Sequence, residues 1–328
     1  MEIRDHYGLA LAVVGPEELA ARPWARPGRD IDVVRVVDPP ATFWPELGAH
    51  GFLRKPSAVA WVAELGSGEE EFLSRLRRTA RRDIRRAQRD AAAAGLTEVI
   101  EEPVSPAALD RFLALYADRV AQMDFGVPFA LGHRDAVLDG PDKFFGVFAY
   151  AGEELAGGCL VRECPDDDAA VVRFSAVTAE WRRSSLARVL YLTALRVARS
   201  KGYRWATLGN EPNLIGHLTK PGLFRFKADL GFRTVPSQDF ADPDGHDEAD
   251  LVLRLDRLND PTFLLAYADP VDAAERRLAG HLFCVTPQDT APYAAPFLIS
   301  TSPTLPAGHR CGAAGGPDRT GPDRTGPD

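Results

Sequence analysis

The sequence predicts an α/β (α+β) protein in which helices pack against a mixed sheet. Three observations support this prediction. Of the 328 residues, 45% are hydrophobic and 26% are charged, the balance of globular proteins. Between residues 143 and 235, strand and helix patterns follow one another in the order β-β-β-α-β-α-β. An arginine-rich stretch before them has the periodicity of an amphipathic helix.

Residues 1–65 carry short apolar runs that prolines interrupt. The runs 32–37 and 58–65 have the length and the β-branched content of strands, whereas only residues 16–21 favour a helix. We therefore expect the strands and loops of a first folded unit.

Residues 67–95 predict one long helix. Ser67 and Glu70 form a capping box, glutamates lie at the positive end of the helix dipole, and Gly95 provides a left-handed stop. At ~1.5 Å per residue, this helix is on the order of 40 Å long. A narrow apolar stripe repeats at steps of three and four residues: Leu73, Leu76, Ala80, Ile84, Ala87 and Ala91.

Arginine fills most of the remaining surface of this helix: Arg75, Arg77, Arg78, Arg81, Arg82, Arg85, Arg86 and Arg89. A solvated surface helix is one interpretation of such a run. The other is a phosphate-binding face, because a guanidinium group stays charged and binds two phosphate oxygens at once. In that role, Arg78, Arg81, Arg82, Arg85 and Arg86 bind the phosphates of a nucleotide cofactor, an activated sugar or a tRNA.

The elements after residue 95 follow from apolar periodicity and turn residues. A strand at 96–101 precedes a helix that Ser105 caps, with Phe112 and Tyr116 on its apolar face, and residues 124–142 form a loop. The pattern then predicts strands at 143–150, 155–161, 171–178, 203–208, 232–235 and 251–255, and helices at 186–201 and 223–230.

This pattern divides the chain into four parts. We predict an N-terminal half at 1–95 that ends in the basic helix, a C-terminal half at 96–260, a peripheral extension at 261–286 and a flexible, disordered tail at 287–328. The tail ends in the low-complexity run GGPDRTGPDRTGPD, which offers little to bury in a core.

Charge and composition exclude several classes. The net charge of −8 disfavours a DNA partner, and no run approaches the ~18 consecutive apolar residues of a membrane span. Four cysteines without paired spacing indicate the reducing cytoplasm. We expect no metal, because the histidines and cysteines lack zinc spacing. The acidic run 239–250 lacks the ligand spacing of a calcium loop and is interpreted as a solvated connection.

The turn before the helix at 186–201 carries a first resemblance. With the strand order around it, the run Arg182-Arg183-Ser184-Ser185-Leu186-Ala187 resembles the phosphate-binding loop of the acyl-CoA N-acyltransferases, the GNAT superfamily. The resemblance implies that Arg182, Arg183, Ser184, Ser185 and Ala187 bind the donor pyrophosphate at a helix N-terminus. Ser185 and Leu186 stand where glycine would let the backbone approach phosphate closely, so an ordinary N-cap by Ser184 or Ser185 is the alternative.

A second resemblance spans residues 70–236. The arginine-rich helix, the helix with Phe112 and Tyr116, the strand 203–208 and the run Gly222-Leu223-Phe224-Arg225-Phe226-Lys227 are similar to the Fem-type aminoacyltransferases and their acetyltransferase-like relatives. This resemblance implies two GNAT-like halves and the transfer of an acyl or aminoacyl group to an amine. It also implies that Lys227 donates to the oxyanion or holds the terminal phosphates of tRNA, with Phe226 beside it. The alternative for Lys227 is an exposed lysine on an amphipathic helix.

The segment 209–220 leaves the carboxyl end of a predicted strand, an edge at which open α/β sheets bind ligands. Glu211 or His217 is a candidate to accept a proton from the attacking amine, directly or through water. A structural role is the alternative for each.

Three functions remain open. The favoured one is an enzyme that forms an amide by transfer from aminoacyl-tRNA to a small-molecule or peptide amine. The second is an acyl-CoA-dependent N-acetyltransferase acting on a small amine. The third is a non-catalytic GNAT-like module that binds RNA or protein. In the first two, tRNA or acyl-CoA is a co-substrate, and no tightly bound cofactor is expected.

Overall fold

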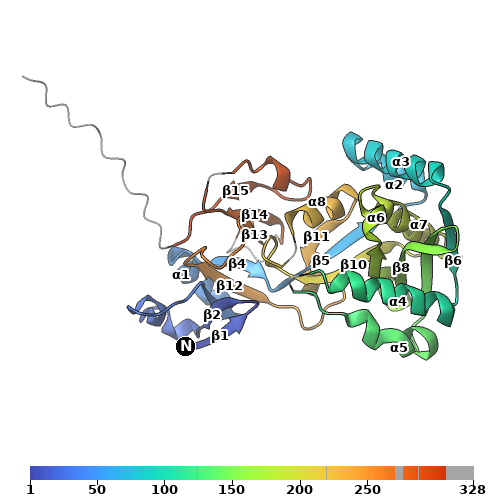
Figure 1. Ribbon diagram of the computed structural model, residues 1–328. Coiled ribbons are helices and arrows are strands. Elements are labelled where there is room, and N and C mark those ends of the chain that lie inside the picture. The colour runs from blue at the N-terminus through green and yellow to red at the C-terminus, as the bar shows by residue number, and fades with distance from the viewer. Residues whose placement is uncertain (124, 219, 270–275, 287, 308–328) are drawn as a thin grey trace, which may run out of the picture.

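The computed structural model describes residues 1–123, 125–218, 220–269, 276–286 and 288–307. The described residues form three sheets, and Figure 1 shows the largest of them, with most of the helices, at the end away from the N-terminus. Parallel and antiparallel strand pairs occur together, and helices pack against the sheets. The predicted α/β class with a mixed sheet is confirmed.

The largest sheet has seven strands in the order β11-β5-β10-β9-β8-β7-β6. Its strands are β5 (Ala58–Glu64), β6 (Thr97–Glu101), β7 (Phe144–Ala151), β8 (Glu154–Cys164), β9 (Ala169–Val177), β10 (Trp205–Pro212) and β11 (Arg233–Pro236). Neighbours pair antiparallel except β9 and β10, which are parallel.

Helices cover both faces of this sheet. One face shares an apolar core with α2 (Glu69–Ser74), α3 (Arg78–Ala93), α7 (Leu186–Ser200) and α8 (Pro221–Asp229). The other shares a core with α4 (Pro106–Val120) and α5 (Arg134–Asp139). As predicted, Ser105 caps α4, because its hydroxyl oxygen accepts from the Ala108 N–H at 3.3 Å.

The second sheet has the strand order β1-β2-β3-β12-β4. Its strands are β1 (Glu2–His6), β2 (Leu9–Val13), β3 (Val33–Val37), β4 (Leu53–Pro56) and β12 (Asp247–Val252), and α1 (Trp44–Ala49) packs on it. β12 therefore joins a sheet made mostly by the first residues, whereas the early strand β5 lies in the largest sheet. The predicted division between residues 95 and 96 does not coincide with a boundary between sheets.

The third sheet contains β13 (Thr262–Tyr267), β14 (Leu278–Phe283) and β15 (Thr301–Pro303). Phe263 and Leu265 lie in the core beneath α8, whereas Leu264 packs with Leu9 of the second sheet. We predicted a peripheral extension at residues 261–286. The described part of this segment is instead buried between the two larger sheets. All six residues of β13 are buried, so both faces of this strand are covered.

The chain also remains folded beyond residue 287, the predicted start of the tail. Tyr293, Ala295 and Leu298 are buried in the largest core, and β15 pairs with β14. These contacts continue the third sheet, and the low-complexity end of the predicted tail, 308–328, lies outside the described residues.

The prediction of one long helix at residues 67–95 is wrong. The segment 67–95 forms α2 and α3 rather than one helix, because the chain turns at residues 75–77 and buries both Phe72 and Leu76. At this turn the Arg75 guanidinium donates to the Glu64 carbonyl oxygen at 2.7 Å. Ser67 bonds the Glu71 carboxylate instead of forming the predicted box with Glu70.

The segment 124–142, predicted as a loop, contains α5. Its Val137 is buried against the core of α4. Tertiary burial stabilises this short helix, which has too few residues to show a clear apolar period.

Candidate active site

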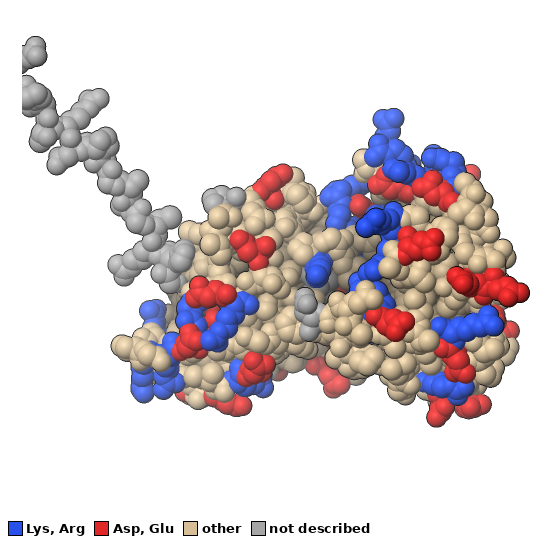
Figure 2. Space-filling model, in the orientation of Figure 1, with Lys and Arg blue, Asp and Glu red and all other residues tan. Residues whose placement is uncertain are grey.

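The parallel strands of the largest sheet pair over three residues only. The pairs run from Trp205–Ala169 to Thr207–Val171, after which β9 continues to Val177 and β10 to Pro212 without pairing to each other. Ligands of α/β sheets bind at the carboxyl ends of such strands. Figure 2 shows a hollow between the region of α8 and that of α6 (Ala179–Arg182) and α7, with Lys and Arg side chains on its walls. This opening is the candidate site.

Lys227 and Glu211, both predicted as catalytic, contact each other here. Lys227 Nζ donates to Glu211 Oε2 at 2.5 Å, and Trp61 Nε1 donates to Glu211 Oε1 at 2.5 Å. The ammonium also lies 5.1 Å from the centre of the Trp61 ring. Because the two charged side chains are only 12% and 13% exposed, their ion pair is largely withdrawn from water. Three elements, α8, β10 and β5, thus fix the position of one ammonium group.

This arrangement bears on the chemistry of both groups. Both oxygens of Glu211 accept hydrogen bonds, so the carboxylate is arranged to hold Lys227 rather than to act as a general base. An ammonium group carries three N–H donors, and the bond to Glu211 uses one of them. The remaining donors suit an oxygen that gains negative charge during a reaction.

Phe226, predicted beside Lys227, lies on the α7 side of α8. Its ring centre is 5.8 Å from that of Tyr191, and the Arg188 guanidinium lies 5.1 Å from the Phe226 ring centre. The Tyr191 and Ser175 hydroxyls are 2.8 Å apart and share a hydrogen bond. Burial raises the pKa of Tyr191 to about 12, so its hydroxyl keeps its proton at neutral pH.

Sequence reasoning missed Tyr191, Arg188 and Ser175. Tyr191 lies within an amphipathic helix, where an aromatic residue is ordinarily interpreted as part of the hydrophobic core, and Ser175 lies within a strand. Only the packing of α7 across β9 brings their hydroxyls together. The sequence contains no local signal for this contact.

The turn before α7 places the predicted donor-binding residues at a helix N-terminus. Arg182 and Arg183 are exposed, and the Ser184 hydroxyl donates to the Trp181 carbonyl oxygen at 2.8 Å. Ser185 adopts a left-handed backbone, with φ +62°, and α7 begins after it without a side-chain cap. Ala187 lies in the first turn of α7. Ser185 therefore occupies the N-cap position, as the alternative predicted, but its hydroxyl makes no capping hydrogen bond to the backbone of α7.

His217 lies elsewhere. Its ring is buried, with Nε2 2.8 Å from the Tyr7 carbonyl oxygen and the Phe125 ring 5.5 Å away. These contacts hold the segment after β10 against the turn between β1 and β2. The structure does not bring His217 into contact with Lys227 or Glu211.

A cavity of about 300 Å³ opens beyond the carboxyl end of β10, and Glu211 forms part of its wall. The facing wall comes from the second sheet and includes His6, Arg35 and Lys55. Burial and the charge of Arg35 lower the pKa of His6, which is therefore neutral at pH 7. The cavity lies next to the ion pair of Lys227, and polar and charged side chains contribute to its walls.

Arg35 and Lys55 of this wall belong to a cluster of four buried charged residues, with Glu248 and Asp250. Asp250 accepts from Arg35 Nε at 2.7 Å, and Glu248 accepts from Lys55 Nζ at 2.6 Å. Cross-contacts at 3.0 Å and 3.3 Å join Arg35 to Glu248 and Lys55 to Asp250. Burial alone would raise the pKa of Asp250, but the two cations outweigh it and lower the pKa to about 2. The end of the acidic run 239–250 is therefore a buried ion cluster and not the solvated connection that we predicted.

The predicted phosphate patch lies on α3. Arg78, Arg82, Arg85 and Arg86 are exposed, whereas Arg81 is half-buried. The apolar stripe opposite them, from Ala80 to Ala91, is buried in the core that α3 shares with α7. Figure 2 shows basic side chains gathered over α3 and continuing towards the central hollow.

Within the described residues, no group of three or more His, Cys, Asp or Glu side chains is placed to hold a metal ion. None of the described helices combines the length and the apolarity that crossing a membrane requires.

Comparison with known proteins gives one family match. Residues 78–227, a little under half of the chain, match the model of the acetyltransferase (GNAT) domain. No curated protein matches the chain closely enough to count as a relative.

Several solved structures are similar to part of this chain at low identity. FemX has 14% identity over 76% of this chain and 83% of its own, with a TM-score of 0.44. L-PGS from Bacillus licheniformis has 11% identity over 66% and 67%, with a TM-score of 0.39. A tandem GNAT protein from the clavulanic acid biosynthesis pathway has 16% identity over 71% and 68%, with a TM-score of 0.38. Likenesses at this level say nothing about substrates.

Proposed function

We propose that the chain is an acyltransferase of the GNAT superfamily, because residues 78–227 match the model of the acetyltransferase (GNAT) domain, and that it transfers an aminoacyl group from a charged tRNA to an amine. The observation that favours this donor is the exposed arginine face of α3. A row of guanidinium groups along a helix suits the regularly spaced phosphates of a nucleic acid better than the few phosphates of a small molecule.

Lys227 is the proposed oxyanion donor. The neutral amine attacks the ester carbonyl carbon, a C–N bond forms and the carbonyl oxygen becomes an oxyanion that accepts from Lys227. Collapse of this intermediate breaks the bond between the carbonyl carbon and the ribose oxygen. The ribose oxygen leaves with the proton that the attacking nitrogen gives up, and the product is an amide. Glu211 and Trp61 act as positioning residues, because Glu211 accepts from the ammonium at 2.5 Å and Trp61 holds the other oxygen of that carboxylate at 2.5 Å.

The acceptor is proposed to enter from the polar cavity at the end of β10. This cavity reaches Glu211, so an amine bound in it approaches the ion pair from the side of the second sheet. Its neutral and charged polar walls suit a small-molecule or peptide amine.

A second candidate donor is acyl-CoA, and the turn before α7 favours it. The left-handed Ser185, the exposed Arg182 and Arg183, and the helix N-terminus without a side-chain cap are features that bind pyrophosphate. Under this alternative, Lys227 keeps its role and only the leaving group changes.

The test compares both donors in one design. The purified protein is incubated with a panel of amines and either a mixture of radiolabelled aminoacyl-tRNAs or labelled acetyl-CoA, and labelled amide is separated and counted. We expect amide from aminoacyl-tRNA that depends on Lys227 and is lost in Lys227→Ala. If amide forms from acetyl-CoA and not from aminoacyl-tRNA, the donor is acyl-CoA rather than tRNA. Turnover of neither donor across the panel would favour a non-catalytic binding module.

A further inference from the structure

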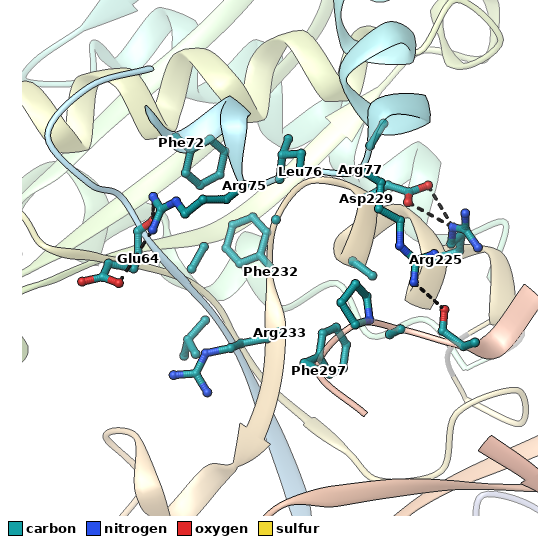
Figure 3. A pocket seen from close by; sticks show the side chains of 18 of the residues that line it. Glu64, Phe72, Arg75, Leu76, Arg77, Arg225, Asp229, Phe232, Arg233 and Phe297 are labelled. Atoms are coloured by element: carbon teal, nitrogen blue, oxygen red, sulfur yellow. Dashed lines mark hydrogen bonds and ion pairs between the residues drawn. The ribbon is translucent and has the colours of Figure 1, made fainter. Parts of the chain in front are cut away.

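A second cavity lies on the other side of α8 from Lys227. It holds about 320 Å³ between the turn that precedes α3, α8, β11 and residues 294–297. Figure 3 shows the rings of Phe72, Phe232 and Phe297 along it, with guanidinium groups around its edge. Neither Lys227 nor Glu211 lines it, so it is separate from the proposed reaction site.

The edge of this cavity carries more positive than negative charge. Four arginines and two carboxylates line it: Arg75, Arg77, Arg225, Arg233, Glu64 and Asp229. Asp229 binds Arg225 at 3.0 Å, and Glu64 lies 3.7 Å from Arg75. Arg77, by contrast, has the Ala294 carbonyl oxygen as its contact at 3.3 Å, and Figure 3 shows Arg233 pointing away from the other labelled residues. No carboxylate among the described residues pairs with Arg77 or Arg233 within salt-bridge distance.

The cavity therefore combines two features that recognise a nucleotide. Guanidinium groups bind phosphate oxygens, and aromatic rings stack on bases. Besides the phenylalanines, Trp205 lies on the wall. A volume of about 320 Å³ lies at the lower end of the range for small-ligand sites, which suits one nucleotide unit rather than a longer ligand.

The cavity also continues into the arginine face of α3. Arg77 is the N-cap residue of α3, and the exposed Arg78 is the next residue. From Arg78, the exposed Arg82, Arg85 and Arg89 follow at steps of four, three and four residues. This spacing puts the four on one face of the helix, over a length of roughly 16 Å. A polyanion that leaves the cavity at Arg77 therefore meets a row of cations.

We propose that this cavity binds one base of a single-stranded RNA, with its phosphate on Arg77 and Arg233 and the adjoining phosphates along α3. The inference rests on the proposed use of tRNA as donor, because the unpaired end of a tRNA is the source of such a strand. It adds a second contact for the donor, at a place distinct from the site of transfer.

Binding of a short RNA tests the inference without any ester to transfer. The probe is the single-stranded RNA ACCA with 2-aminopurine in place of one adenine, whose fluorescence falls when the base stacks on an aromatic ring. We expect quenching by the wild-type protein and an affinity at least tenfold lower for the double variant Arg77→Gln/Arg233→Gln. We also expect roughly tenfold weaker binding for Phe297→Leu, which removes a ring from the wall.

The control is Arg4→Gln/Arg26→Gln, which removes the same charge from two exposed arginines in the N-terminal part of the chain, neither of which lines the cavity. It should bind RNA within about twofold of wild type. Unchanged binding by the Arg77/Arg233 variant, or equal binding of a hexaglutamate peptide, would overturn the inference. This assay needs no turnover, so RNA binding and transfer can fail separately. Normal RNA binding by Lys227→Ala, together with its loss of activity, would show that the cavity acts independently of the transfer site. Unchanged RNA binding by the Arg77/Arg233 variant would count against the cavity alone.

Discussion

The Lys227 ammonium donates to the Glu211 carboxylate at 2.5 Å, which ties α8 to the unpaired end of β10. Trp61 holds the second oxygen of the same carboxylate from β5. The Glu211 carboxylate therefore links three segments, one of them 150 residues away in the sequence, at the point where the parallel strands separate.

The first prediction concerns this ion pair. Lys227→Met should lower kcat about 100-fold or more, because an oxyanion loses its donor. Glu211→Gln keeps the shape and should lower kcat about tenfold, with a smaller change in KM, because the ammonium is held less firmly. Steady-state kinetics with the active donor measure both. Equal activity of Lys227→Met and wild type would show that Lys227 has no catalytic role.

The ion pair should also be visible in stability. Each single substitution, Lys227→Met or Glu211→Gln, leaves a largely buried charge without its partner and should lower the free energy of unfolding by about 3 kcal/mol. The double variant should lose less than the sum of the two. Urea unfolding of all four proteins gives the coupling, and additive losses would contradict it.

The second prediction is a pH dependence from the buried ion cluster. The pKa of Asp250 is about 2 in the folded protein against the ordinary value of 3.8, so its contribution is complete above pH 3.8 and is lost as the pH falls towards 2. The stability gap between wild type and Asp250→Asn should narrow by roughly 2 kcal/mol between pH 5 and pH 2. Urea unfolding across this range measures the gap. Asp244→Asn, an exposed control in the same acidic run, should show no such narrowing.

The third prediction concerns the arginine face of α3. Arg78→Gln/Arg82→Gln/Arg85→Gln should weaken tRNA binding and reduce the slope of log affinity against log salt by about 2 to 3, since each phosphate contact contributes ~0.9 or somewhat less. Filter binding at several salt concentrations measures the slope. The triple control Arg4→Gln/Arg26→Gln/Arg29→Gln removes the same charge elsewhere. If both triples change the slope equally, net charge rather than α3 accounts for binding.

The fourth prediction tests the backbone of Ser185. At φ +62°, alanine keeps the strain of a side chain in the left-handed region, whereas glycine relieves it. Ser185→Gly should therefore be about 0.5–1 kcal/mol more stable than Ser185→Ala, after the greater flexibility of unfolded glycine is included. Thermal unfolding of the two variants measures the difference. The opposite order, which is usual within helices, would contradict a left-handed turn.

Local pattern was sufficient for much of the fold and for part of the candidate site. The apolar stripe of α3, the N-cap of α4 and the hairpin of β7 and β8 each depend on residues within one segment, so their spacing predicts them. Lys227 and Phe226 were found in the same way, from a short run of residues on α8.

The contacts of these residues needed the folded chain. Glu211 was predicted as a base, but the structure shows that Lys227 and Trp61 occupy both of its oxygens. His217 was predicted at the same site, yet it contacts Tyr7. A loop residue carries no local signal that distinguishes these outcomes, because its partners come from other strands.

The sequence by itself determined the α/β class and the arginine face of α3, since each depends on the periodicity or composition of one segment. Lys227 was singled out by the family resemblance of the short run at residues 222–227. Only the tertiary structure assigned β5 to the largest sheet and β12 to the second, and buried Asp250 and Glu248 against Arg35 and Lys55. Strand pairing and ion pairing join residues that are distant in the chain. Their energies depend on which surfaces come together, and local spacing does not record that.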